Sequence, residues 1–247
     1  MPIKTSERRR GCRLFLSYDA AMKRIAIVLT SHAQLGSTGK ATGYYLPEAA
    51  HAWAVFEAAG HAVVFVSPKG GLAPLDPGGQ DRNDAANAKF LDDPVVQHGV
   101  THTFRPEELR GEHIATVFFA GGHGTMWDFR GDPKLAQLAT DCARAGGVVS
   151  AVCHGPAALV DLEIDGKKLV ADQPVTGFSN TEEEAVQLTN VVPFLLEDAL
   201  KASGGRYTKA DKNFTAHVEV GRNLVTGQNP QSTKGVAEAI VKLLAER

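Results

Sequence analysis

Continuous apolar runs recur along the chain and predict strands that are buried on both faces. The four longest are rich in Val, Ile, Phe and Ala, and they cover residues 25–30, 61–68, 113–120 and 148–152. None of them alternates apolar and polar positions, as a strand with one face in water does. We therefore expect a mostly parallel central sheet. Shorter strands are expected at residues 168–170, 174–176 and 223–226.

Segments of helical composition or spacing separate these runs. They span residues 46–59, 84–90, 106–109, 132–146, 156–162, 182–200 and 232–247. Strands that alternate with helices are typical of an α/β fold. The pattern predicts one flavodoxin-like sandwich over residues 22–247, with helices on both faces of the sheet. Residues 1–21 are basic and lack periodicity, so we expect a poorly ordered N-terminal tail.

Composition and charge narrow the class of protein. The 247 residues are 43% hydrophobic and 22% charged, as in an ordinary globular protein, and the net charge is −2. This charge argues against nucleic acid or a membrane surface as the main partner. No apolar run reaches the roughly 18 residues of a membrane helix. Three widely spaced cysteines without a CxxC pair suit a reducing, cytoplasmic location.

The segment VVSAVCHGPAAL carries the clearest chemical signal in the sequence. A buried strand runs directly into Cys153, and a predicted helix begins just after it. Such a tight turn presents its side chain at the carboxyl end of the sheet, where open α/β folds place their chemistry. A helix N-terminus favours the thiolate, and the N–H groups of His154 and Gly155 are candidate donors to an oxyanion. We expect Cys153 to be a nucleophile with a lowered pKa.

The remaining candidates have weaker patterns. Cys12 lies in the tail and Cys142 on the packing side of a predicted helix, so both are read as structural. The nine histidines show no HxH or HExxH spacing, so no metal site is expected. The loop at 121–124 lacks the spacing of a phosphate-binding loop.

Four motifs together resemble the ThiJ/PfpI superfamily, which has the class I glutamine-amidotransferase-like fold. They are TGYYLPEAAHAW, FFAGGHGTMWDF, AVCHGPAAL and TGQNPQST, in this order along the chain. The resemblance runs from about residue 23 to the C-terminus. The DPGG loop and the segment FSNTEEEAVQLTNVVPFLLED resemble the branch of heat-shock chaperones and glyoxalase III enzymes.

The resemblance implies roles for individual residues. Cys153 matches the family nucleophile, His154 the histidine after it, and Glu48 the buried glutamate that hydrogen-bonds the cysteine. An acidic residue after Thr176-Gly177-Phe178 pairs with the histidine, which here is Glu183 or its neighbour Glu182 or Glu184. The pair Gly121-Gly122 matches the oxyanion loop, and His123 either lines the pocket or caps the loop. From the residues alone, the favoured interpretation of Glu48 is an exposed glutamate in the first turn of a helix, and the resemblance reverses this preference.

The resemblance implies conversion of 2-oxoaldehydes such as methylglyoxal to 2-hydroxy acids, through a hemithioacetal on Cys153. No glutathione, metal or other cofactor is expected, and related deglycase activity and a stress-protective role follow from the same chemistry. Two alternatives stay open: a cysteine amidase or peptidase, and a holding chaperone or redox sensor that uses the same cysteine. The superfamily is often dimeric, so a homodimer is also expected.

Overall fold

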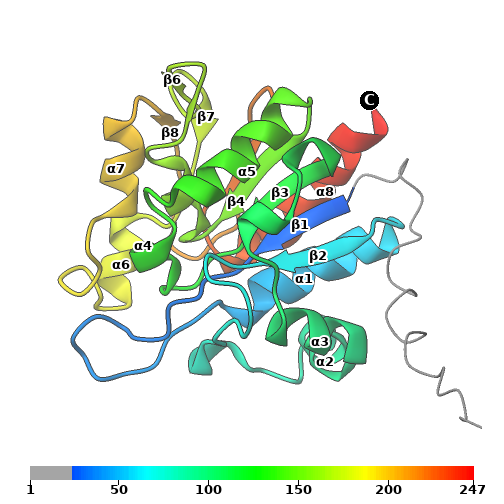
Figure 1. Cartoon of the computed structure of the whole chain (residues 1–247). Helices are drawn as coiled ribbons and strands as arrows, with labels where there is room; N and C mark the ends of the chain where they lie inside the picture. Colours follow the sequence, from blue (N-terminus) through cyan, green and yellow to red (C-terminus); the bar gives the residue numbers. More distant parts are fainter. Residues whose placement is uncertain (1–23) are drawn as a thin grey trace, which may run out of the picture.

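The computed structural model describes residues 24–247, and its centre is a six-stranded sheet (Figure 1). In spatial order the strands are β2 (Val63–Val66), β1 (Arg24–Val28), β3 (Ile114–Phe119), β4 (Val148–Val152), β10 (Leu224–Gly227) and β9 (Val218–Val220). The first five strands run parallel and β9 is antiparallel to β10. Every residue of β3, β4 and β10 is buried. The mostly parallel sheet expected from the apolar runs is therefore confirmed.

Helices cover both faces of this sheet, as expected. They are α1 (Leu46–Ala58), α2 (Ala85–Asp92), α3 (Pro94–Thr101), α4 (Thr125–Asp128), α5 (Pro133–Arg144), α6 (Asn180–Ala185), α7 (Leu196–Ala202) and α8 (Thr233–Ala245). Helices α1 and α8 pack together on one face, and α5 packs against β3 and β4 on the other (Figure 1). None of these helices in the described part of the chain is long and apolar enough to cross a membrane.

Several local predictions were wrong or incomplete. The segment after β4 is a 3-10 helix at Gly155–Leu159 instead of an α-helix over 156–162. The helix expected over 182–200 is two short helices, α6 and α7, with an irregular segment between them. Two small sheets were only partly foreseen, formed by β5 (Glu163–Ile164) with β6 (Lys167–Lys168) and by β7 (Pro174–Val175) with β8 (Arg206–Tyr207). The predicted tail at 1–21 lies outside the described residues.

The strand register gathers the candidate site at one edge of the sheet. Val28 at the end of β1 pairs with Phe119 at the end of β3, and Phe119 pairs with Ala151 of β4. Gly227 at the end of β10 pairs with Val152. The segments that follow these strands therefore start side by side, at the carboxyl edge where open α/β sheets bind ligands.

Candidate active site

The turn that carries Cys153 is held in an unusual backbone conformation. Cys153 has φ of 59°, in the left-handed region that a residue with a side chain seldom adopts. Its N–H donates to the Gly227 carbonyl at 3.0 Å, and its carbonyl accepts from the Phe178 N–H at 2.8 Å. A Cβ on Gly155 would lie 2.1 Å from the Phe119 carbonyl oxygen, so only glycine allows this close approach. The turn therefore aims Cys153 away from the sheet at a fixed angle.

The Cys153 thiol lies beside the ring of the next residue. Its Sγ atom is 3.4 Å from Nδ1 of His154, and only 4% of the Cys153 residue is exposed. Neighbouring residues on a regular strand or helix do not meet in this way, and the left-handed turn is what brings the two side chains together. The thiol can donate its proton to Nδ1 when that nitrogen carries none.

A carboxylate fixes the other side of the same histidine. Nε2 of His154 is 2.7 Å from Oε2 of Glu183, and Nε2 of His123 is 3.0 Å from Oε1 of Glu183. Of the three consecutive glutamates, Glu183 is the one that contacts His154. Because Glu183 accepts the proton on Nε2, Nδ1 of a neutral His154 faces the thiol as an acceptor.

The charge in this cluster resides on Glu183. Burial by itself would raise the pKa of the Glu183 carboxyl, but attraction to His154 and hydrogen bonds from both imidazoles hold it well below its usual range. Burial, and then repulsion from His123, lower the pKa of His154, although Glu183 opposes this shift. The cluster is best described as an ionised carboxylate with a neutral His154, because burial disfavours a charged ring that already has one partner.

Glu48, in the first turn of α1, is a second group that contacts the thiol. It is completely buried, so the exposed first-turn alternative was wrong. Oε2 accepts from the Gly121 N–H at 2.7 Å, and Oε1 has no hydrogen-bond partner among the described residues. Burial raises the pKa of Glu48 to about 8, although contact with Cys153 and the Gly121 N–H opposes the rise. Glu48 is therefore a neutral acid at pH 7, with a proton that can point toward the sulfur.

The lowered thiol pKa expected from the sequence was wrong. Burial, together with repulsion from the Glu48 carboxylate, raises the pKa of Cys153 well above its ordinary value, and only the His154 N–H opposes this. The helix N-terminus that motivated the expectation is a short 3-10 turn. Two acids this close together in a buried site resist carrying two negative charges at once. Cys153 is therefore a thiol that needs a base, not a preformed thiolate.

The predicted oxyanion loop is also corrected in one respect. The N–H of Gly121 is already engaged by Glu48, so it is not a free donor for substrate. Gly122 has φ of 99°, and a Cβ there would lie 2.3 Å from the Gly43 carbonyl oxygen. The loop passes so close to the start of α1 that both positions exclude a side chain. His123 follows this loop, and its imidazole reaches Glu183.

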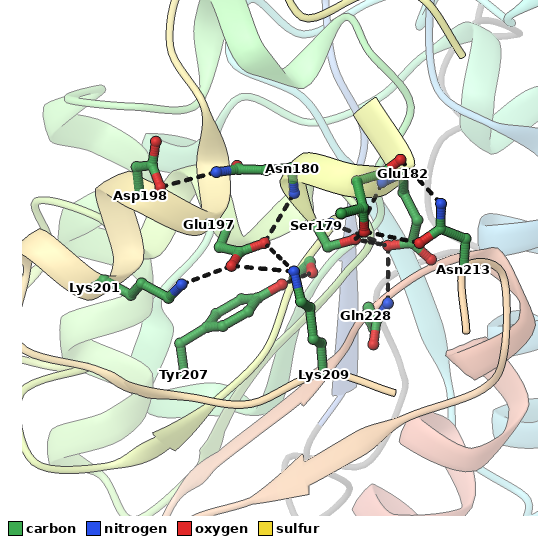
Figure 2. Close-up of polar contacts among 12 residues, drawn as sticks. Ser179, Asn180, Glu182, Glu197, Asp198, Lys201, Tyr207, Lys209, Asn213 and Gln228 are labelled. Carbon is green, nitrogen blue, oxygen red and sulfur yellow. Dashed lines mark hydrogen bonds and ion pairs between the residues drawn. The ribbon is translucent and has the colours of Figure 1, made fainter. Parts of the chain in front are cut away.

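Two buried carboxylates, Glu182 and Glu197, hold α6 in place, a role that the sequence analysis did not give to either of them (Figure 2). Glu182 accepts hydrogen bonds from the side chain and N–H of Ser179, the side chains of Gln228 and Asn229, and the N–H of Phe214. Glu197 accepts from the Asn180 N–H at 2.9 Å and pairs with Lys201 and Lys209. Helix α6, which carries Glu183, is thereby anchored at its first turn. The sequence Ser179-Asn-Thr-Glu182 is a capping-box pattern, which could have identified this role.

An aromatic side chain that the sequence analysis did not assign packs on the histidine. The ring of Phe178 lies 4.3 Å from that of His154, and the ring of His123 lies 4.1 Å away from His154. Phe178 also contacts Phe214, which is 40% exposed at the surface. These contacts restrict the rotation of His154 about its Cα–Cβ bond. Nothing in the sequence pattern distinguishes Phe178 from an ordinary core residue.

The fold and this site together define an α/β protein with a cysteine elbow, flanked by a buried acid and a histidine–carboxylate pair. The chain belongs to the DJ-1/PfpI family, whose sequence model matches residues 40–243. The resemblance drawn from the four motifs is thus confirmed.

Relatives and solved structures extend this comparison over nearly the whole chain. Glyoxalase 3 of Candida albicans is 29% identical over 239 residues, which cover 89% of this chain and 98% of the relative. The glutathione-independent glyoxalase HSP31 of Saccharomyces cerevisiae is 29% identical and covers 88% of this chain and 96% of its own length. The 24 kDa rapid encystment protein of Francisella tularensis is 36% identical with a TM-score of 0.86, over 90% of this chain and 99% of that one. The crystal structure of Candida albicans glyoxalase III has a TM-score of 0.82 at 26% identity, over 89% and 96% of the two chains.

Proposed function

We propose that this protein is a glutathione-independent glyoxalase that converts a 2-oxoaldehyde, such as methylglyoxal, to the corresponding 2-hydroxy acid. One observation carries the proposal: the Cys153 thiol contacts one group that can donate a proton and one group that can accept a proton. Glu48 is a buried neutral acid, and Nδ1 of His154 is an acceptor. Relatives with this function cover almost the whole chain.

In the first step the thiol adds to the aldehyde carbon of the substrate. The S–H proton passes to Nδ1 of His154 as the S–C bond forms, since the raised thiol pKa requires a base at the moment of attack. The aldehyde oxygen gains negative charge and then takes the proton that His154 received from the thiol, which gives a hemithioacetal and leaves His154 neutral. The N–H groups of Gly122 and His154 are the donors that we assign to this oxygen, because the Gly121 N–H is occupied by Glu48.

In the second step a proton moves between the two substrate carbons. A base removes the hydrogen on the carbon bonded to sulfur, and the resulting enediolate takes a proton on the neighbouring carbon. The product is a thioester of the 2-hydroxy acid on Cys153. Glu48 in its ionised form is the base that we assign to this transfer, and it returns the proton to the neighbouring carbon. A carboxyl with a pKa of about 8 is partly ionised near neutral pH, so it can both take and give a proton there.

In the third step water attacks the thioester and releases the 2-hydroxy acid. The proton of water goes to the His154 and Glu183 pair, and the sulfur leaves as the thiol after it regains a proton. The sum of the three steps adds one water to the substrate and changes no net oxidation state. Cys153 takes the place that a glutathione thiol holds in a two-component reaction.

The test is formation of lactate from methylglyoxal without added thiol. Wild type should form lactate, and Cys153→Ala should retain less than a few per cent of this rate while keeping its fold. Cys142→Ala is the matched control, because Cys142 is also buried but lies in α5 away from the elbow. Lactate formation by Cys153→Ala at the wild-type rate would refute the proposal.

Two further expectations accompany this function. The substrate is a small molecule. We infer a homodimer from the family, and a cytoplasmic location from three widely spaced cysteines that include no CxxC pair. Light scattering after size exclusion measures the oligomeric state, and a monomer at micromolar concentration would refute the homodimer. Fractionation of the native cells measures the location.

A further inference from the structure

Glu183 is flanked by two imidazoles, although the proposed reaction uses only one. His154 Nε2 lies 2.7 Å from one carboxylate oxygen, and His123 Nε2 lies 3.0 Å from the other. A carboxylate that only orients His154 needs no second histidine. His123 is therefore a group for which the reaction assigns no proton transfer, placed where it shares a carboxylate with the reacting base.

We propose that His123, His154 and Glu183 form a binding site for a divalent transition-metal cation of the zinc type, and that its occupancy inhibits the enzyme. One ligand atom from each residue lies within 4.8 Å of the other two. A zinc ion sits about 2.0–2.2 Å from nitrogen and oxygen ligands. Ligand atoms around a tetrahedral ion at this distance lie about 3.4 Å apart, so the atoms that are farthest apart here approach each other by up to about 1.4 Å when the ion binds.

The chemistry of the three ligands selects the type of metal. Two imidazole nitrogens and one carboxylate suit zinc and its neighbours in the first transition row, whereas magnesium and calcium prefer oxygen ligands. Three protein ligands with a fourth position open to water is the arrangement of accessible zinc sites. His123 has a side-chain exposure of 19%, whereas His154 and Glu183 are almost completely buried. An ion therefore enters past His123.

The supporting contacts keep these ligands in place. Glu183 is carried by α6, whose first turn is tied down by the hydrogen bonds to Glu182 and Glu197 (Figure 2). The ring of His154 packs against the rings of both His123 and Phe178. Ligands that are fixed before binding lose little conformational freedom when the ion arrives.

Metal binding at Nε2 would remove His154 from the reaction. A neutral imidazole that binds a metal through Nε2 carries its proton on Nδ1. Nδ1 is the atom that faces the Cys153 sulfur, so it would change from an acceptor of the thiol proton to a donor. The sulfur itself lies on the Nδ1 side of the ring, so it is not one of the ligands. A metal ion in this site thus inhibits the enzyme without binding to the Cys153 sulfur.

The experiment measures zinc binding directly, so it does not depend on the proposed reaction. Zinc chloride is titrated into wild type, Cys153→Ala, His123→Asn and the double variant His98→Asn/His102→Asn, in competition with a chromophoric chelator. The double variant is the matched control, because His98 of α3 and His102 just after its end form an exposed stacked pair that offers an alternative site. Circular dichroism verifies that each variant keeps its fold.

Wild type, Cys153→Ala and the double variant should each bind one zinc ion with similar affinity. His123→Asn should weaken binding by at least about 10- to 100-fold, the loss that even a residue beyond the ligand shell causes. X-ray absorption of the zinc complex should show nitrogen and oxygen ligands without sulfur. Loss of zinc in Cys153→Ala, sulfur in the spectrum, or full affinity in His123→Asn would each overturn the proposal.

Inhibition is measured separately, as loss of lactate formation on titration with zinc and its recovery with a chelator. His123→Asn should need at least about tenfold more zinc than wild type for half-inhibition, in proportion to its weaker binding. Equal inhibition of both proteins would refute the link between this site and activity. If wild type shows no lactate formation, the proposed function fails while the binding results still decide the metal site.

Discussion

The two sides of the site hold buried carboxyl groups in opposite states. On the side of α1, Glu48 is neutral, because burial raises its pKa to about 8. On the side of α6, Glu183 is ionised, because two imidazoles hold its pKa well below the usual range despite burial. Both residues are glutamates in the first turn of a helix, and both are almost inaccessible to water.

The difference arises from what each helix packs against. The first turn of α1 faces the apolar core, and it offers Glu48 one backbone N–H together with a thiol. The first turn of α6 faces two histidines, which supply hydrogen bonds and attraction to negative charge. Position in a helix therefore does not decide the charge of a buried carboxyl here. The hydrogen-bond partners of the carboxyl decide it, and as a result one proton donor and one proton acceptor lie beside the same thiol.

The largest effect should come from removal of the proton on the α1 side. Glu48→Gln keeps the shape of the side chain and its hydrogen-bonding capacity, but it cannot exchange a proton. Turnover of methylglyoxal should fall by about 10²–10⁴-fold, the usual contribution of a general acid–base group. Formation of the hemithioacetal should survive, so the loss should appear in kcat more than in binding.

The matched control for this experiment is Glu57→Gln, because Glu57 lies on the same helix but forms a surface pair with Lys89. Steady-state kinetics with methylglyoxal should show wild-type turnover for Glu57→Gln. Wild-type turnover in Glu48→Gln as well would show that Glu48 transfers no proton in the reaction.

A smaller loss is expected on the α6 side. Glu183→Gln leaves Cys153 and His154 in place. It removes the carboxylate that selects the His154 tautomer with its proton on Nε2. We expect turnover to fall, but by less than in Glu48→Gln, because Glu183 orients His154 and does not itself exchange a proton with the substrate carbons. Glu184→Gln is the control, since Glu184 is the exposed neighbour in the same helix. Equal kinetics of the two variants would show that contact with His154 is not what matters at this position.

The opposite charge states also predict opposite effects of pH on stability. The pKa of Glu48 is raised in the folded state, so its contribution to stability is complete below the ordinary glutamate value of 4.5 and is lost as pH rises to about 8. This loss amounts to about 1.4 kcal/mol for each unit of pKa shift. The pKa of Glu183 is lowered, so its contribution is present above 4.5 and is lost as pH falls below that value.

Urea unfolding of wild type, Glu48→Gln and Glu183→Gln between pH 4 and 8 measures both signs. Wild type should lose stability relative to Glu48→Gln as pH rises, and relative to Glu183→Gln as pH falls below about 4.5. Parallel curves for wild type and Glu48→Gln would mean that Glu48 titrates alike in the folded and unfolded states.

The central sheet could be predicted from the sequence because its strands are buried on both faces. The runs at β1, β3 and β4 are continuously apolar, which leaves few alternatives. β9 could not be predicted in this way, because it is three residues long and partly exposed. The helix expected after Cys153 was wrong because Gly-Pro suits the start of an α-helix and of a 3-10 helix equally.

The site shows a similar division. Cys153 and His154 follow from the strand-to-turn pattern, but the choice among Glu182, Glu183 and Glu184 does not, because three identical side chains give no signal. The fold makes the choice: Glu182 caps α6, Glu183 reaches the histidines and Glu184 is exposed. The raised pKa of Cys153 could not be foreseen either, since it depends on burial and on Glu48, which is 105 residues away in the sequence.

The smallest effect concerns that thiol, and it tests the link between Cys153 and Glu48. Thiolate absorbance against pH, with Cys153→Ala subtracted, should give wild type a midpoint above the ordinary value of about 8.5. In Glu48→Gln burial remains but the carboxylate is gone, so the midpoint should fall. The size of the decrease measures how much of the raised pKa comes from repulsion by Glu48. A wild-type midpoint below the ordinary value would show that Cys153 is a thiolate before substrate binds, as the sequence analysis expected. An unchanged midpoint in Glu48→Gln would show that burial alone raises the pKa of Cys153, and that the two acids titrate independently.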